Sequence, residues 1–536
     1  MDRRIYILLL LFLMLGIACS ESFIDKPQLA TQTTDNFYKT DDDAIKAVTA
    51  VYNYFQQYDF EVSKFEFGDI ASDDAEKGGE SDNDRPFVKD LEYFRSRSDN
   101  FSCRSMWSVC FTAIYHANNT ETQIAKINMD QQLKDRLIAE VRFIRAHFYF
   151  YLINIFGEVP LVTKTLSPNE YHLPKASKTA IWNQIEDDLI FAKEHLPLKS
   201  GYAKDDLGRI TKGTAQTFLA NAYLFQKKWA LAKKEAKEVI LSGEYNLEPD
   251  FQNLFQIQKS DFGMESVFEV PHISTNTGWG DENEGTVVPV FCRSRNAGGW
   301  GFNCPTLDLL NEFEPGDPRL VHTILFDGDD FEGEVQFNQY SPSHLHSRKV
   351  FLAPSERVGF DASDAPFNMK IIRYAEVLLI HAEAACENGD LEEARLSLNL
   401  VRNRARQSSA VDDKITFKNV NKYLVTKNQY EQYDFVKYNY WEANNDLANL
   451  LPDVTTNDQQ ILRNAIRHER RVELAMENKR FYDIIRWGEP ETHFHRFAAR
   501  WETGKGGQFR KNINEVFPIP QDELDLNPRM TQNPGY

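Results

Sequence analysis

Positive charge is in short supply in this sequence. The 536 residues include 61 Lys and Arg but 80 Asp and Glu, which gives a formal net charge of −19 at pH 7. Proteins that bind nucleic acids gather Lys and Arg against the phosphate backbone. The excess of acidic residues therefore argues against a nucleic-acid partner.

Long apolar runs are also scarce, and the single one lies near the start of the chain. It covers residues 5–15, follows two arginines and leads into Cys19. Because a membrane-spanning helix needs ~20 apolar residues, this run has the layout of a secretion signal instead. We predict a lipoprotein signal peptide at 1–18, acylation (palmitate) of Cys19, and a lipid-anchored tether over 19–34. Ordinary signal cleavage with an incidental Cys19 is the alternative.

Signatures of catalysis are missing from the sequence. It contains no G-x-S-x-G nucleophile elbow, no Walker A loop and no Rossmann fingerprint. Acidic residues are so frequent that a pair of carboxylates in the sequence does not indicate a glycosidase site unless the distance between them is known. We therefore predict that the protein is not an enzyme.

Metal-binding patterns are missing as well. His468 precedes Glu469 but has no second histidine four residues later, so the metalloprotease helix is absent. The close histidine pairs are expected at the surface or in loops: His344 with His346, and His493 with His495. The acidic loop at 69–76 lacks the alternating ligands of an EF-hand. We expect no metal and no cofactor, with a structural calcium ion in that loop as the alternative.

Cysteines are few, with five after Cys19. Cys103 and Cys110 are seven residues apart on one predicted helix, which puts their Cα atoms ~10 Å apart, too far for a disulfide. Cys292 and Cys304 flank a glycine-rich loop and could pair in an exported protein. Free thiols are the alternative at these two positions.

Helical periodicity is abundant. The longest predicted helix covers 131–156 and ends before Gly157. Two helix pairs, at 211–243 and 371–405, carry alanine at close-approach positions and resemble tetratricopeptide units of ~34 residues. An insert at 248–370 separates them and combines turn residues with short strand-like pieces. We predict a mainly α fold, a tetratricopeptide-like helical repeat scaffold with long irregular loops and a few short strands.

Nine segments, taken in order, resemble one family across most of the chain. They are FYKTDDDAIKAVTAVY, AEVRFIRAHFYFYLINIFGEVPLV, GRITKGTAQTFLANAYLF, YNLEPDFQNLF, FEPGDPR, IIRYAEVLLIHAEAACENGD, ERRVELAMENKRFYDIIRWG, FPIPQDELDLNP and QNPGY. The family is the SusD/RagB family of Bacteroidetes surface lipoproteins. The resemblance implies a SusD-like N-terminal helical region at 35–247 and a RagB/SusD C-terminal region at 248–536.

The same resemblance implies a function. Family members capture a nutrient, usually a glycan, at the cell surface and deliver it to a SusC-like TonB-dependent transporter, without catalysing a reaction. We therefore expect a surface-exposed protein, anchored by its N-terminal lipid to the outer membrane, that binds an oligosaccharide or polysaccharide. The alternatives are peptide capture, as in RagB-like members, and a tetratricopeptide scaffold that binds another protein. A surface hydrolase is a third.

Sugar binding requires aromatic faces beside planar polar groups, in a largely pre-formed cleft. The insert supplies both, because glycines flank two tryptophans beside Asp, Asn and Arg. The candidate ligand-binding residues in the insert are Trp279, Asp281, Asn283, Arg293, Arg295, Asn296 and Trp300. On the opposite wall they are Asp73, Asp74, Arg85 and Tyr93, with Tyr340 and Arg348 as weaker candidates. The alternative is that the two tryptophans cap the core.

Other family-typical residues have a structural interpretation. We expect ion pairs that lock helices together at Arg142, Arg145, Glu469, Arg470, Arg471 and Arg486. The aromatic run Phe148 to Tyr151 is expected to pack between helices.

Overall fold

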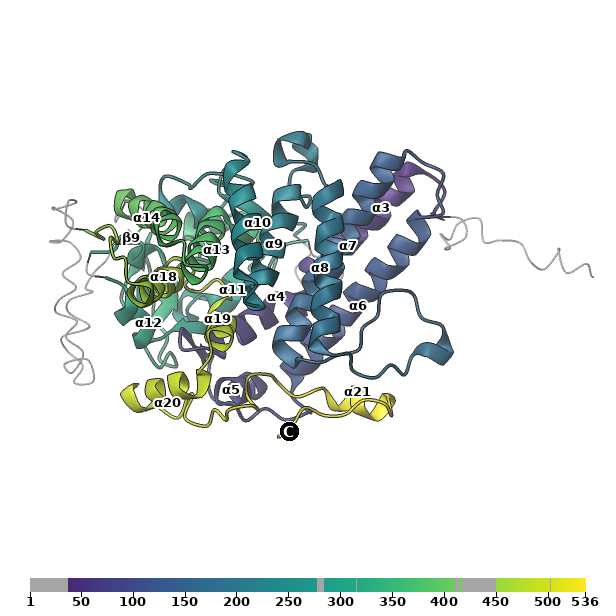
Figure 1. Ribbon diagram of the computed structural model, residues 1–536. Coiled ribbons are helices and arrows are strands. Elements are labelled where there is room, and N and C mark those ends of the chain that lie inside the picture. Colours follow the sequence, from purple (N-terminus) through teal and green to yellow (C-terminus); the bar gives the residue numbers. More distant parts are fainter. Residues whose placement is uncertain (1–36, 277–283, 315, 410–414, 417–449, 502) are drawn as a thin grey trace, which may run out of the picture.

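The computed structural model describes residues 37–276, 284–314, 316–409, 415–416, 450–501 and 503–536, and its arrangement is mainly helical (Figure 1). Over that part of the chain, no helix combines the length and apolar character needed to cross a bilayer. The first helices are α3 (Asp41–Tyr52), α4 (Tyr58–Phe65), α5 (Pro86–Glu92), α6 (Phe101–Ile124), α7 (Gln131–Phe156), α8 (Lys178–His195), α9 (Lys212–Phe225) and α10 (Trp229–Leu241). The later ones are α11 (Val288–Cys292), α12 (Leu307–Glu312), α13 (Tyr374–Glu387), α14 (Leu391–Gln407), α18 (Gln459–Glu473), α19 (Arg480–Trp487), α20 (Pro490–Trp501) and α21 (Gln521–Leu526).

The long helices form one continuous stack. Contacts run from α6 to α7, then through α8, α9 and α10 to α13, α14 and α18 (Figure 1). The close pair α9 and α10 is possible because Ala220, Ala222, Ala232 and Ala236 are fully buried. Since α10 contacts α13 directly, the stack continues across the insert. The predicted mainly α, tetratricopeptide-like fold is confirmed.

The insert leaves and rejoins the stack at one place. Strand β2 (Ser266–Val270) pairs antiparallel with β8 (Met369–Arg373), so the two ends of the insert are neighbours. Further short strands are β1 (Ala75–Gly78), β3 (Phe302–Pro305), β4 (Ile324–Phe326), β5 (Asp330–Phe331), β6 (Glu334–Val335), β7 (Leu345–Ser347) and β9 (Ile415–Thr416). They form small sheets, in which β1 pairs with β3, β4 with β7, and β5 with β6 and β9. The insert is therefore built from small sheets, loops and the short helices α11 and α12.

Aromatic side chains fill the core of the stack. Phe148 and Tyr149 are fully buried on α7, and Phe150 and Tyr151 are nearly so. The Phe148 ring packs on Phe55 and Phe60, from the helices before it. The predicted packing of this run is confirmed.

A buried network of charges fixes the insert against the last helices. Arg373, at the end of β8, binds Glu265 at 2.5 Å and Glu473 of α18 at 2.9 Å. Arg404 of α14 binds the same two carboxylates. Arg319 also binds Glu473, at 3.0 Å. Because each guanidinium is matched by carboxylates, these charges can be buried. Removing one partner would leave another buried charge without a counter-ion.

The residues predicted to lock helices together do form ion pairs. The pairs are Arg142–Glu121, Arg145–Asp188, Glu469–Arg319, Arg470–Asp483, Arg471–Asp74 and Arg486–Glu383. Their interpretation as structural residues is confirmed.

Candidate functional site: a loop platform

Two loops emerge side by side because of one strand pairing. Gly78, at the end of β1, pairs with Phe302, at the start of β3. The loop after β1 (79–84) therefore lies beside the loop before β3 (293–301), and the Gly79 amide donates to the Gly301 carbonyl at 2.8 Å. Loops held on a rigid frame in this way are common binding surfaces.

A third segment, 335–340, joins these two loops. The Asn296 amide donates to the Phe337 carbonyl, and its side chain donates to the Val335 carbonyl, both at 3.1 Å. Phe337 and Tyr340 are large aromatic residues that remain 40% and 43% exposed. We call the three segments, 79–84, 293–301 and 335–340, the loop platform.

Glycines shape the platform around Trp300. A Cβ atom at Gly299 would overlap the Arg293 carbonyl, and Gly301 has a φ of +71°, which side-chain-bearing residues rarely adopt. The Trp300 amide donates to the Val290 carbonyl at 2.8 Å. Its indole meets the Phe291 ring edge-on, with centroids 6.3 Å apart. Trp300 is thus partly exposed and partly packed on the core.

The charges on the platform are largely satisfied. Arg295 binds Asp84 at 2.6 Å and lies 3.6 Å from Glu80. Arg293 is buried and donates to the Gly298 carbonyl at 3.1 Å. Burial, together with the nearby Arg357, lowers the pKa of Arg293 to about 10. The surface therefore offers aromatic faces and amides beside one guanidinium that is already paired.

The early loop is not the open wall that the sequence predicts. Asp73 and Asp74 are buried. Asp73 binds Arg480 at 2.7 Å and His493 at 2.9 Å, and Asp74 binds Arg471 at 2.8 Å. Burial raises the pKa of Asp73, but these cationic neighbours outweigh it and hold the pKa well below its usual range. Both carboxylates stabilise the fold instead of facing a ligand.

Three other predicted residues lie away from the open platform surface. Arg85 caps α5 and binds Glu66 at 2.7 Å, and Tyr93 ends α5 partly buried. Arg348 is buried and donates to the Phe351 carbonyl at 3.1 Å. Trp300, Asn296, Arg295 and Tyr340 lie on the platform, with Arg293 buried beneath it. Trp279, Asp281, Asn283 and Cys19 lie outside the described residues.

The disulfide between Cys292 and Cys304 is not formed. Both cysteines are free and buried, as are Cys103 and Cys110. The Cys304 thiol donates to the Gly301 carbonyl at 3.4 Å. Burial raises the pKa of Cys304 to about 12, so the thiolate that oxidation requires is scarce. These residues pack as small apolar side chains.

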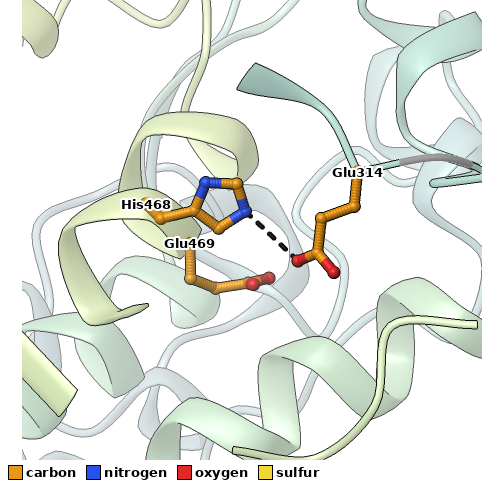
Figure 2. A group of neighbouring side chains, drawn as sticks. All are labelled: Glu314, His468 and Glu469. Carbon is orange, nitrogen blue, oxygen red and sulfur yellow. Dashed lines mark hydrogen bonds and ion pairs between the residues drawn. The ribbon is translucent and has the colours of Figure 1, made fainter. Parts of the chain in front are cut away.

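One group of side chains has the composition of a metal site. Glu314, His468 and Glu469 lie together, with the imidazole directed at the Glu314 carboxylate (Figure 2). His468 binds Glu312 at 2.7 Å and Glu314 at 3.2 Å. Despite burial, which lowers it, these carboxylates raise the pKa of His468 to about 10. Both ring nitrogens of His468 are thus engaged by carboxylates, and a metal ion would have to displace one of these bonds and the proton in it.

The other histidine pairs are only partly at the surface. His495 is exposed, but His346 is buried. His344 and His346 each bind Asp327 at 2.7 Å. For His346 the prediction of a surface position is wrong, because Asp327 satisfies its imidazole in the interior.

Sequence analysis missed a concave surface between α18, α19 and α20. Arginines line it at positions 467, 471, 480 and 496. The signal that could have revealed it is helical spacing, since Arg467 and Arg471, and likewise Arg496 and Arg500, lie four residues apart on one helix face.

Two family models match the chain. One is described as "SusD family" and matches residues 264–536, and the other, "Starch-binding associating with outer membrane", matches residues 30–224. The SusD-like protein P2 of Formosa agariphila is 26% identical over 549 residues, which cover 99% of each chain.

Solved structures are similar over nearly the whole length. A "Laminarin binding SusD-like protein" has a TM-score of 0.73 and 26% identity, and the match covers 93% of this chain and 100% of that one. Surface glycan-binding protein A from Bacteroides thetaiotaomicron in complex with laminarihexaose also has a TM-score of 0.73, over 92% and 100% of the chains. At 19% identity, the latter likeness is one of fold.

Proposed function

Because the chain belongs to the SusD family, as the nine sequence segments predicted, we propose that it is a glycan-binding protein whose ligand lies on the loop platform. The observation that carries this proposal is the exposure of Phe337 and Tyr340 beside Trp300, on loops that are hydrogen-bonded to one another. Large exposed aromatic groups on a pre-formed surface are typical of ligand sites.

The chemistry of the platform suits a sugar. An aromatic ring can cover the CH face of a pyranose, and the Asn296 amide and Arg295 guanidinium can bind hydroxyl groups at its edge. Such hydrogen bonds largely replace bonds to water, so each adds only ~1 kcal/mol. The proposal therefore predicts modest affinity that depends strongly on the aromatic residues. The proposed mechanism is binding alone and includes no covalent step.

Glycan binding is tested by affinity electrophoresis in gels that contain laminarin or other neutral polysaccharides. We expect retention of the wild type and loss of most retention in the Trp300→Ala/Tyr340→Ala variant, because the stacking faces are removed. A matched control is Trp229→Ala/Tyr171→Ala, which removes a partly exposed tryptophan and an exposed tyrosine outside the platform. Equal retention of both variants would refute the platform. Binding of peptides but no glycan by the wild type would favour the RagB-like alternative.

We also propose that the protein is a surface-exposed outer-membrane lipoprotein, held by a lipid on Cys19, that delivers its glycan to a TonB-dependent transporter. The family description "associating with outer membrane" supports this location. Lipid anchoring is tested with Cys19→Ala, which should be released from membranes by a salt wash in cells without the transporter. Retention of that variant would contradict the anchor. Co-purification of the wild type with a TonB-dependent transporter tests the delivery partner.

A further inference from the structure

A cavity lies between α18, α19 and α20, and none of its lining residues belongs to the loop platform. Its volume is about 320 Å³, and an adjoining hollow of about 310 Å³ shares several of its walls. Ligand pockets in proteins usually begin at ~300 Å³. The residues that define this arginine cleft are Arg467, His468, Arg471, Arg480, Trp487 and Arg496.

Most of the positive charge in the cleft is already used by the fold. Arg471 binds Asp308 at 2.9 Å as well as Asp74, and Arg480 binds Asp73. The protonated His468 is held by Glu312 and Glu314. These groups form a rigid wall whose charges are balanced.

Two arginines differ from the rest. Within the described parts of the chain, Arg467 and Arg496 form no ion pair and no side-chain hydrogen bond. The Arg467 Nε atom is buried without a hydrogen-bond partner, and its guanidinium lies over the Trp487 ring, 4.9 Å from the centroid. Arg496 is exposed at the rim, on α20. Two guanidinium groups are thus available on opposite helices of one cavity.

Glu383, an acidic neighbour of Arg467, is already occupied. The Glu383 carboxylate binds Arg486 at 2.5 Å and accepts a hydrogen bond from the Trp487 indole at 2.9 Å. The indole is therefore fixed in place, and it holds Arg467 against its face. A guanidinium pre-positioned in this way loses little side-chain entropy when it binds a carboxylate or sulfate through two parallel hydrogen bonds.

We propose that the arginine cleft binds the oxyanion of an acidic saccharide, a carboxylate or a sulfate ester, between Arg467 and Arg496. The proposal rests on the proposed function in taking the ligand to be a saccharide. It extends that function, because on the loop platform the guanidinium of Arg295 is paired with Asp84 and that of Arg293 is buried. Arg467 and Arg496 add positive charge to a wall whose other cations are largely paired, and Glu489 is a carboxylate of the same lining that this charge must outweigh.

The test is isothermal titration of the full chain with sodium glucuronate, sodium sulfate and glucose at constant ionic strength. We expect saturable binding of at least one anion and none of glucose. Binding of glucuronate indicates a carboxylate ligand, and binding of sulfate alone indicates a sulfate ester. In Arg467→Gln/Arg496→Gln, the affinity should fall at least tenfold.

The matched control is Arg104→Gln/Arg529→Gln, which removes the same charge from two exposed positions elsewhere. An equal loss in this control, or unchanged affinity in the cleft variant, would overturn the proposal. If Arg467→Gln/Arg496→Gln and Arg104→Gln/Arg529→Gln are both retained on laminarin gels, the anion site and the glycan site are separate. Anion binding without any glycan binding would refute the proposed function but leave the anion site in place.

Discussion

The loop platform and the arginine cleft are two candidate binding surfaces with opposite chemistry. On the platform the aromatic residues are exposed, and Arg295 is paired with Asp84. In the cleft Trp487 is fixed by Glu383, and among the described residues Arg467 and Arg496 have no ion-pair partner. The comparison teaches that side-chain type alone does not identify a binding residue. What matters is whether the fold has already satisfied that side chain.

Asp73 connects the two surfaces. Its carboxylate binds Arg480 and His493, which line the cleft. Its carbonyl accepts a hydrogen bond from the Thr306 hydroxyl at 2.5 Å, next to the β1–β3 pair that supports the platform. A change at Asp73 should therefore disturb both surfaces at once.

The largest effect is expected for Asp73→Asn. Removing the charge leaves buried guanidinium groups without a counter-ion, which should cost about 3–5 kcal/mol of unfolding free energy. Urea denaturation measures this loss. The control Asp522→Asn breaks the exposed pair with Arg104 and should cost under ~1 kcal/mol. Equal stability of the two variants would mean that Asp73 does not join the surfaces.

The second prediction concerns the charge of His468, a residue of the arginine cleft. The pKa of His468 is about 10 in the folded protein, above its ordinary value of 6.5. The stability that it contributes is fully present below pH 6.5 and is lost as the pH rises through about 10, in total on the order of 2–4 kcal/mol.

Unfolding free energies of the wild type and His468→Gln should therefore differ most near pH 6.5 and converge toward pH 10. His495→Gln, at an exposed position, serves as the control for the substitution itself. A constant difference for His468→Gln would show that its charge is not held by Glu312 and Glu314.

The smallest effect is confined to the platform. In Gly299→Ala the new methyl group overlaps the Arg293 carbonyl and displaces the loop. Glycan affinity should fall about tenfold, or ~1.4 kcal/mol, while anion binding in the cleft is unchanged. Gly507→Ala is the control, because its nearest neighbours are 3.6 Å away. Loss of both glycan binding and anion binding in Gly299→Ala would mean that the two surfaces are not independent.

Sequence reasoning succeeded where the signal is local or recurs along the chain. The helix at 131–156, the helix pairs and the family followed from periodicity and ordered segments. The structural role of Arg470 and Arg486 followed from their place in the family segments. The helices depend on neighbours a few residues away, whereas Glu383, the partner of Arg486, lies 103 residues earlier in the sequence.

The same reasoning failed where distant segments meet. Asp73 resembled a loop residue, yet its partners lie more than 400 residues later in α19 and α20. Arg348 and His346 are likewise satisfied inside the insert. The arginine cleft was missed because three helices assemble it. Ligand contact by Trp300 stays a prediction.

The antiparallel pairing of β2 with β8 has an evolutionary consequence. Both ends of the insert meet there, and α10 packs directly on α13, so the chain enters and leaves the insert at one place. The β1–β3 pair and the ion pairs of Arg319 hold the body of the insert to the rest of the molecule. Its loops can lengthen, shorten or be exchanged without shifting the helices that support them. Specificity can therefore diversify quickly in a lineage while the scaffold is retained.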